Sequence, residues 1–132
     1  MMSFASWFAV GGGAAVGAWL RWGLGILLNP VFPTVPLGTL ASNLVAGFLM
    51  GIAMELVTRN TALSPEIRLL MTTGFLGGLS TFSTFSAEIV TLLSHKEYVW
   101  GLFAIAAHVV GSVVLTVLGI YAVRLLFPLE AA

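Results

Sequence analysis

The stretch from Gly74 to Ser86 holds the residue types in this chain that are best suited to chemistry. It reads G-F-L-G-G-L-S-T-F-S-T-F-S, with three glycines and a run of hydroxyl side chains interrupted by phenylalanines. Hydrocarbon cannot satisfy exposed backbone groups or hydroxyls, so such a segment at membrane depth is tolerated only inside protein or beside a water-filled path. The segment therefore predicts a place where something polar binds or passes.

The two phenylalanines after the glycines are three residues apart. On a helix Phe82 and Phe85 point to nearly the same side, with Ser83 and Thr84 between them. A phenyl ring has an electropositive edge, so two rings presented edge-on can support an anion without a formal positive charge. The alternative is that the rings only fill core volume, and the residues alone leave both interpretations open.

The composition places this segment in a membrane. Of 132 residues, 59% are hydrophobic and 8% are charged, with a mean hydropathy of +1.08, against about a quarter charged in soluble domains. Each long apolar segment reaches the roughly 20 residues that span a bilayer as a helix. We therefore expect an all-α integral membrane protein, a single domain over 1–132 with four transmembrane helices over 4–28, 37–57, 65–93 and 99–127.

The third of these helices is long for a simple span. About 29 residues give roughly 43 Å of straight helix, well beyond a hydrocarbon core of about 30 Å. Gly77 and Gly78 lie near its middle and precede Ser80 and Thr81, which predicts a broken helix with exposed backbone carbonyls that attract cations. The alternative use of the glycines is close helix packing.

Small and polar residues recur four apart in the other helices. The three tracks are Gly13, Gly17, Arg21 and Gly25; Asn43, Gly47 and Gly51; and His108, Ser112 and Thr116. We interpret the glycines as packing seams. Asn43, Ser112 and Thr116 are better candidates for a polar pathway beside the hydroxyl-rich third helix. His108 stays open between a hydrogen-bonded structural group and a functional one.

Charge and cysteine content remove several classes of function. The net charge is zero, with no basic stripe, so a nucleic-acid partner has no electrostatic support. Cysteine is absent, which excludes disulfides and thiolate metal sites. Arg59, Arg68 and Arg124 fall on one side of a four-helix topology and Arg21 and Lys96 on the other. That near balance leaves a single orientation and a dual topology equally open.

The motif and the whole helix pattern closely resemble the Fluc fluoride channels, also called the CrcB family. The phenylalanine motif, the segment L-G-T-L-A-S-N-L-V-A-G around Asn43 and the segment H-V-V-G-S-V-V-L-T from His108 all fall where that family has them. The resemblance implies an antiparallel, dual-topology homodimer in the bacterial inner membrane, with two fluoride pores and a central structural sodium ion. It implies passive fluoride export and fluoride resistance, and no enzymatic activity.

The resemblance also implies roles for individual residues. The phenylalanine box corresponds to Phe82 and Phe85, and the pore asparagine to Asn43. Backbone carbonyls of Gly77 and Ser80 would bind sodium, and Arg21 would lie at a vestibule that draws in anions. The polar track of the fluoride pathway would be Ser83, Thr84, Ser112 and Thr116. Glu88 follows the motif as in relatives, without a role that the residues determine.

Other classes of function remain as alternatives. The first is a proton-coupled exporter like the small multidrug exporters, which are also four-helix proteins; they depend on an acidic residue in their first helix, and the range 4–28 has none. The second is an intramembrane hydrolase using Ser80 and His108, but no G-x-S-x-G elbow is present. A purely structural subunit explains the glycine seams but not the run of hydroxyls and phenylalanines.

Overall fold

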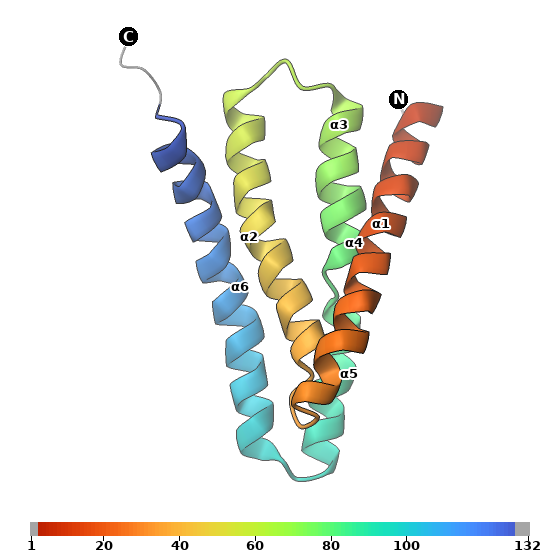
Figure 1. Cartoon of the computed structure of the whole chain (residues 1–132), viewed down its shortest axis with the longest axis vertical. Coiled ribbons are helices and arrows are strands. Elements are labelled where there is room, and N and C mark those ends of the chain that lie inside the picture. The colour runs from red at the N-terminus through yellow and green to blue at the C-terminus, as the bar shows by residue number, and fades with distance from the viewer. Residues whose placement is uncertain (1–2, 129–132) are drawn as a thin grey trace.

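The chain forms an all-helical bundle in a computed structural model, which describes residues 3–128. The elements in chain order are α1 (Phe4–Leu28), η1 (Asn29–Val31), α2 (Leu37–Arg59), α3 (Pro65–Leu69), η2 (Leu70–Leu76), α4 (Gly77–Leu79), α5 (Phe82–Ser94) and α6 (Tyr98–Leu126). These bounds lie within two residues of the ranges expected from the sequence. Figure 1 shows the first turn of α1 and the last turn of α6 at the same end of the bundle as the α2–α3 connection, with the other two connections at the opposite end.

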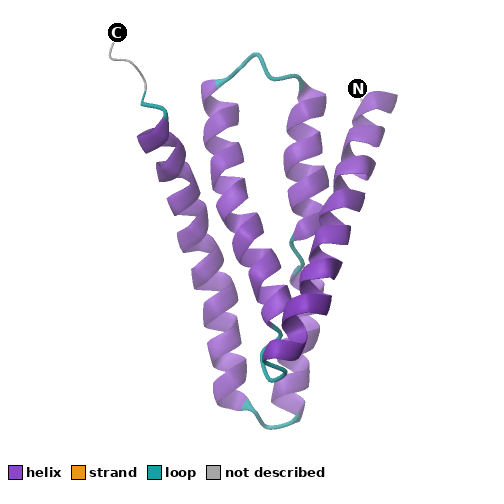
Figure 2. Cartoon of the chain, viewed as in Figure 1, coloured by secondary structure: helices purple, strands orange, loops and turns teal. Residues whose placement is uncertain are grey.

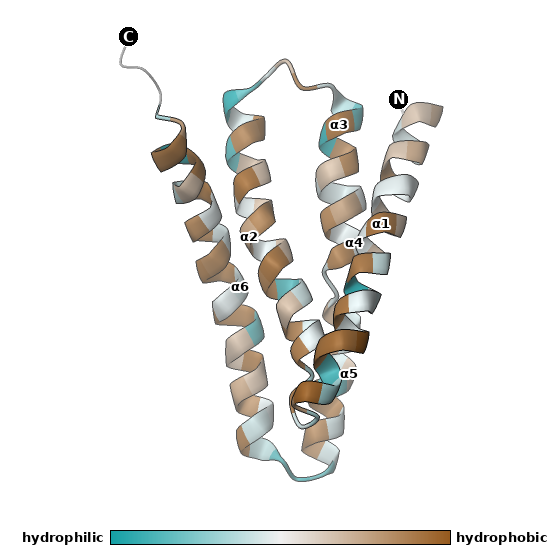
Figure 3. Ribbon diagram, in the orientation of Figure 1, coloured by the Kyte–Doolittle hydropathy of each residue, from teal (hydrophilic) through white to brown (hydrophobic). Residues whose placement is uncertain are grey.

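Three helical segments are long and apolar enough to cross a membrane: Leu37–Arg59, Pro65–Ser94 and Tyr98–Leu126. Brown, hydrophobic ribbon recurs along the long helices in Figure 3, and teal ribbon lies at helix ends and in short bands within α1, α2 and α6. The sequence predicts a fourth span, and α1 has the length for one with 25 residues. Among its apolar residues α1 carries glycines, tryptophans and Arg21.

The third span is broken after Leu79, as the sequence predicts. Ser80 (φ −80°, ψ 155°) and Thr81 (φ −151°, ψ 114°) are extended, and α5 starts at Phe82. Figure 2 shows this break as a loop between two helical halves. The Ser80 hydroxyl donates to the Leu76 carbonyl at 2.9 Å, and the Thr81 hydroxyl accepts from the Thr84 amide at 3.2 Å. Hydroxyl side chains therefore cap both halves.

The half of this span before the break packs closely on α1. Its central part, η2, is a π-helix rather than an α-helix, and it lies along α1. A Cβ on Gly17 would overlap the Phe75 carbonyl oxygen and lie 2.7 Å from the Leu79 amide nitrogen. The glycine track of α1 is thus a packing seam, as expected, because only a hydrogen atom fits between these backbones.

A second seam joins α2 to α6. Gly51 lies directly against the backbone of α6, where a Cβ would overlap the Thr116 carbonyl oxygen. At the end near the chain termini, Glu55 accepts hydrogen bonds from Arg59 at 2.9 Å and from Arg124 at 3.1 and 3.2 Å. This charged cluster fastens the ends of the two helices together.

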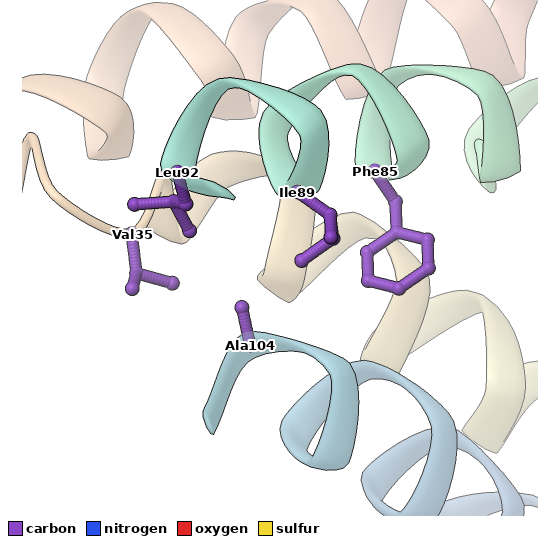
Figure 4. Close-up of a cluster of buried hydrophobic side chains, with 5 residues drawn as sticks. All are labelled: Val35, Phe85, Ile89, Leu92 and Ala104. Carbon is purple, nitrogen blue, oxygen red and sulfur yellow. The ribbon is translucent and has the colours of Figure 1, made fainter. Parts of the chain in front are cut away.

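The other end of the bundle is held by a small apolar core. Phe85, Ile89 and Leu92 on one face of α5 lie against Ala104 of α6 and Val35 of the α1–α2 connection. Figure 4 shows the three α5 side chains on the same side of that helix. This core fixes α5 after the break and thereby sets the position of Phe85.

The α1 seam gives a prediction about stability. Gly17→Ala is expected to destabilise the protein by about 1–3 kcal/mol, because backbone atoms on η2 and α4 must move to admit the methyl group. Gly11→Ala is the matched control in the same helix, since a Cβ there meets nothing within 4 Å. The measurement is denaturant unfolding in detergent followed by tryptophan fluorescence, and equal stability of the two variants would contradict the seam.

Candidate functional site

The helix break is held by one side chain from α2. Asn43 Oδ1 accepts a hydrogen bond from the Thr81 amide at 2.7 Å, and Asn43 Nδ2 donates to the Thr81 carbonyl at 3.0 Å. The amide therefore pairs with extended backbone as a neighbouring strand would. It satisfies two backbone groups that hydrocarbon could not.

Asn43 also reaches α6. Its Nδ2 lies 3.0 Å from Nδ1 of His108, a side chain that is only 5% exposed. The His108 ring is in turn packed on Phe85, with ring centroids 4.5 Å apart. Both hydrogens of the Asn43 amide are thus in use, so this amide can donate to an ion only by giving up one of these partners.

The two phenylalanines lie side by side but in different surroundings. Their ring centroids are 5.5 Å apart with an interplanar angle of 59°. Phe85 is 7% exposed and belongs to the core, whereas Phe82 is 76% exposed. The tilted arrangement turns the rings away from stacking, which leaves ring edges available.

A cavity of about 410 Å³ joins most of the residues that the sequence singles out. Its polar and aromatic lining consists of Asn43, Ser80, Thr81, Phe82, Phe85, His108, Ser112 and Thr116. The lining comes from α2, the break, α5 and α6, so four separate parts of the chain converge here. Ser83 is not part of this lining; it is exposed, with its hydroxyl 3.4 Å from that of Thr81.

The hydroxyls of the α6 track are used differently. The Thr116 hydroxyl lies 2.9 Å from the carbonyl oxygens of both Gly47 and Ser112, so its hydrogen is committed to backbone. The Ser112 hydroxyl makes no hydrogen bond to any residue between 3 and 128 and lines the cavity. Ser112 is therefore the member of the track whose hydroxyl is free to donate to another group in the cavity.

Arg21 and Thr84 line a different cavity, of about 560 Å³, together with Asn29, Thr39 and Thr81. Arg21 Nε donates to the Gly78 carbonyl at 3.0 Å. The guanidinium therefore caps the end of α4 while facing this second cavity. Thr81 lines both cavities, so the helix break separates them.

The break also changes the bonding of backbone carbonyls. In an unbroken helix the amides of Thr81 and Thr84 would donate to the carbonyls of Gly77 and Ser80. Here the Thr81 amide donates to Asn43 and the Thr84 amide to the Thr81 hydroxyl. The carbonyl oxygens of Gly77 and Ser80 thus lose their helical donors, and such oxygens are suitable ligands for a hard cation.

This site lies within a chain that matches a known family over most of its length. The sequence model of the family described as "CrcB-like protein, Camphor Resistance (CrcB)" matches residues 8–120. The chain belongs to the CrcB-like family.

Similar CrcB-like proteins from three bacteria are each named fluoride-specific ion channel FluC. The protein of Nitrosospira multiformis is 59% identical over 116 residues, which cover 88% of this chain and 91% of the relative. That of Pseudomonas putida is 54% identical over 115 residues, or 87% and 91%. That of Ralstonia pickettii is 54% identical over 123 residues, or 93% and 98%.

Two polar contacts at this CrcB-like site were not predicted from the sequence. Thr39 donates to Glu88 at 2.5 Å, which links α2 to α5 one turn away from Asn43. The signal for Thr39 was its position four residues before Asn43, on the same helix face. The second is the hydrogen bond between His108 and Asn43. The sequence singles out both residues, but the spacing of residues on one helix does not reveal which residue of another helix they face.

The Ser80 and His108 pairing that a hydrolase would need does not form among residues 3–128. Ser80 Oγ donates to the Leu76 carbonyl and His108 Nδ1 faces Asn43. The two side chains line the same cavity without a hydrogen bond between them. Ser80 and His108 are therefore not arranged as a hydrogen-bonded nucleophile and base.

The unequal use of the α6 hydroxyls gives a prediction. Thr116→Val is expected to lower the free energy of unfolding by about 1 kcal/mol, because a buried hydroxyl bond to backbone is lost. Ser112→Ala is expected to stay within about 0.5 kcal/mol of the parent. Denaturant unfolding in detergent measures both variants, and a larger loss for Ser112→Ala would show that the two hydroxyls are wrongly assigned.

Proposed function

We propose that the chain is a fluoride-selective channel that lets fluoride flow passively out of a bacterial cell. The cavity that gathers Phe82, Phe85, Asn43 and Ser112 carries this proposal. The names of the CrcB-like relatives point to the same ion. Such a channel would protect a cell that takes up fluoride as its neutral acid, and it would act in the inner membrane.

The chemistry of the cavity suits a small, strongly hydrated anion. Stripping water from fluoride is costly unless other donors replace it step by step. The Ser112 hydroxyl and the edges of Phe82 and Phe85 are such groups, and the amino-terminal end of α5 adds the positive end of a helix dipole. No Lys or Arg lines this cavity among the described residues, so no formal charge there would hold the ion in a deep trap.

Arg21 would serve this path from the neighbouring cavity. Its guanidinium gives that cavity a positive charge that favours anions over cations. Thr84 lines the same cavity, and its hydroxyl hydrogen could bond an entering ion, whereas the Thr39 hydroxyl is committed to Glu88. Arg21 is thus proposed as a vestibule residue that raises the local anion concentration without entering the narrow path.

The exposure of Phe82 supports assembly as an antiparallel homodimer. A phenyl ring that is 76% exposed contacts little of its own protomer, and a second copy could cover it and close the cavity. The three-against-two distribution of Lys and Arg between the two faces permits insertion in both orientations. Two copies in opposite orientations would give two pores, with the four long helices of each copy, α1 included, spanning the membrane.

A sodium ion at the helix break fits the donors present. The carbonyls of Gly77 and Ser80, which have lost their helical donors, are neutral oxygen ligands. The carboxyl end of α4 adds the negative end of a helix dipole. Among the described residues there is no group of three or more acidic, histidine or cysteine side chains that could hold a metal. Sodium is therefore proposed as a structural ion bound by the main chain.

Fluoride efflux from liposomes tests the proposed function. The purified protein is expected to release trapped fluoride rapidly, without a pH gradient, and to retain chloride. Phe82→Ile and Phe85→Ile are expected to abolish fluoride efflux, because an aliphatic side chain has no electropositive edge. Efflux that needed a pH gradient would contradict a channel, and normal flux in both variants would contradict the role of the rings.

The two phenylalanine variants differ in their expected effect on folding. Phe85→Ile is expected to cost about 1–2 kcal/mol, since Phe85 is buried against α6. Phe82→Ile is expected to leave the free energy of unfolding of the protomer nearly unchanged, because the ring is exposed. Size-exclusion chromatography of each variant controls for an intact assembly.

A third prediction concerns the proposed sodium site. Ser80→Ala is expected to leave the sodium dependence of fluoride efflux unchanged, because only the Ser80 carbonyl would bind the ion. The loss of its hydroxyl bond to Leu76 is expected to cost no more than about 1 kcal/mol in stability. Efflux assayed in sodium and in N-methylglucamine measures this, and a changed sodium requirement would make the hydroxyl a direct ligand.

A further inference from the structure

Three parts of the chain meet at the Asn43 amide. Asn43 lies on α2, pairs with the extended backbone of Thr81 and contacts His108 of α6. His108 also packs on Phe85, the buried ring of the proposed fluoride path. His108 thus contacts two residues of the site, Asn43 through a hydrogen bond and Phe85 through its ring.

The hydrogen-bond pattern fixes the chemical state of these groups. Asn43 Oδ1 must face the Thr81 amide, since that amide can only donate. Nδ2 therefore carries the two hydrogens, one directed at the Thr81 carbonyl and one at His108 Nδ1. Nδ1 must accept, so the neutral imidazole carries its own hydrogen on Nε2.

The burial of this group makes the acceptor on His108 necessary. His108 is 5% exposed and Asn43 is half-buried. The second hydrogen of Asn43 Nδ2 points at the buried imidazole, 3.0 Å away, rather than into open water. A buried donor without a partner is costly, and the amide would rotate or shift to find one. Any such movement would also disturb both of its bonds to Thr81, the residue that leads directly into Phe82.

We propose that His108 is a positioning residue: through Nδ1 it holds the Asn43 amide on the Thr81 backbone, and its ring holds Phe85. The inference deepens the proposed channel and rests on it for its effect on flux. His108 acts through Asn43 and Phe85 and is not itself assigned as an ion ligand. It couples α6 to the helix break, so the position of α6 and the geometry of the path are set together.

Three substitutions at His108 separate the acceptor from the ring. In His108→Asn, Oδ1 stands the same number of bonds from the backbone as Nδ1 and can accept from Asn43. In His108→Gln the polar group lies one bond further out, in the position of Nε2, so the acceptor is misplaced. His108→Leu has no acceptor. All three lose the imidazole ring, which makes His108→Asn the matched rescue variant.

The first measurement is amide exchange at Thr81, followed by NMR in detergent. The Thr81 amide is expected to exchange about tenfold faster or more in His108→Gln and His108→Leu than in the parent, because its hydrogen bond to Asn43 opens more often. In His108→Asn it is expected to remain slow. This order is opposite to the helix propensities of Asn and Gln, so a general effect on α6 would reverse it.

The second measurement is fluoride efflux from liposomes. Efflux is expected to fall about tenfold or more in His108→Gln and His108→Leu, and to remain closer to the parent in His108→Asn. Equal losses in all three variants, with Thr81 exchange unchanged, would overturn the positioning role. If the parent conducts no fluoride, the proposed function fails. Thr81 exchange then still decides whether His108 holds the Asn43 amide on the Thr81 backbone.

A third measurement examines the imidazole directly. Nitrogen NMR of histidine-labelled protein is expected to show His108 with Nδ1 bare and hydrogen on Nε2, identified by loss of the signal in His108→Asn. The opposite tautomer would overturn the proposal, since a protonated Nδ1 cannot accept from Asn43.

Discussion

Backbone groups inside a membrane need partners, and the organisation of this molecule follows from that need at one place. The extended residues Ser80 and Thr81 interrupt a long helix, where hydrocarbon cannot hydrogen-bond the exposed amides and carbonyls. The Asn43 amide takes both backbone groups of Thr81. Without a side chain of this shape on α2, the amide and carbonyl of Thr81 would lose these partners, which is costly for buried backbone groups.

The same interruption places two helix ends of opposite polarity next to each other. The carboxyl end of α4 presents carbonyl oxygens, and the amino end of α5 presents amides. The proposed cation site and the proposed anion path would therefore be neighbours, with no acidic or basic ligand from residues 3–128 needed between them. Arg21 fits this scheme, because it caps the Gly78 carbonyl and faces a second cavity.

Helix ranges and the break were predictable from the sequence because apolar length and glycine pairs act locally. The fold differs in detail: Gly77 and Gly78 stay helical, and the chain becomes extended at Ser80 and Thr81, whose hydroxyls bond to backbone. The polar tracks were also visible, but their partners were not. Spacing puts Ser112 and Thr116 on one face, whereas only the approach of α2 commits the Thr116 hydroxyl to Gly47. The Thr39 to Glu88 contact likewise depends on how α2 meets α5.

The two phenylalanines differ in burial, and this difference affects which substitutions each position can accept during evolution. Phe85 lies in the core, so selection for a folded protomer already limits what can replace it. Phe82 contributes little to that core and is largely exposed. Selection for folding alone therefore leaves Phe82 free to vary, and only selection for flux through the proposed path or for assembly would remove mutations there. In a library of variants sorted for expression, substitutions would be depleted at Phe85 but tolerated at Phe82. In the same library sorted for growth in fluoride, they would be depleted at both positions.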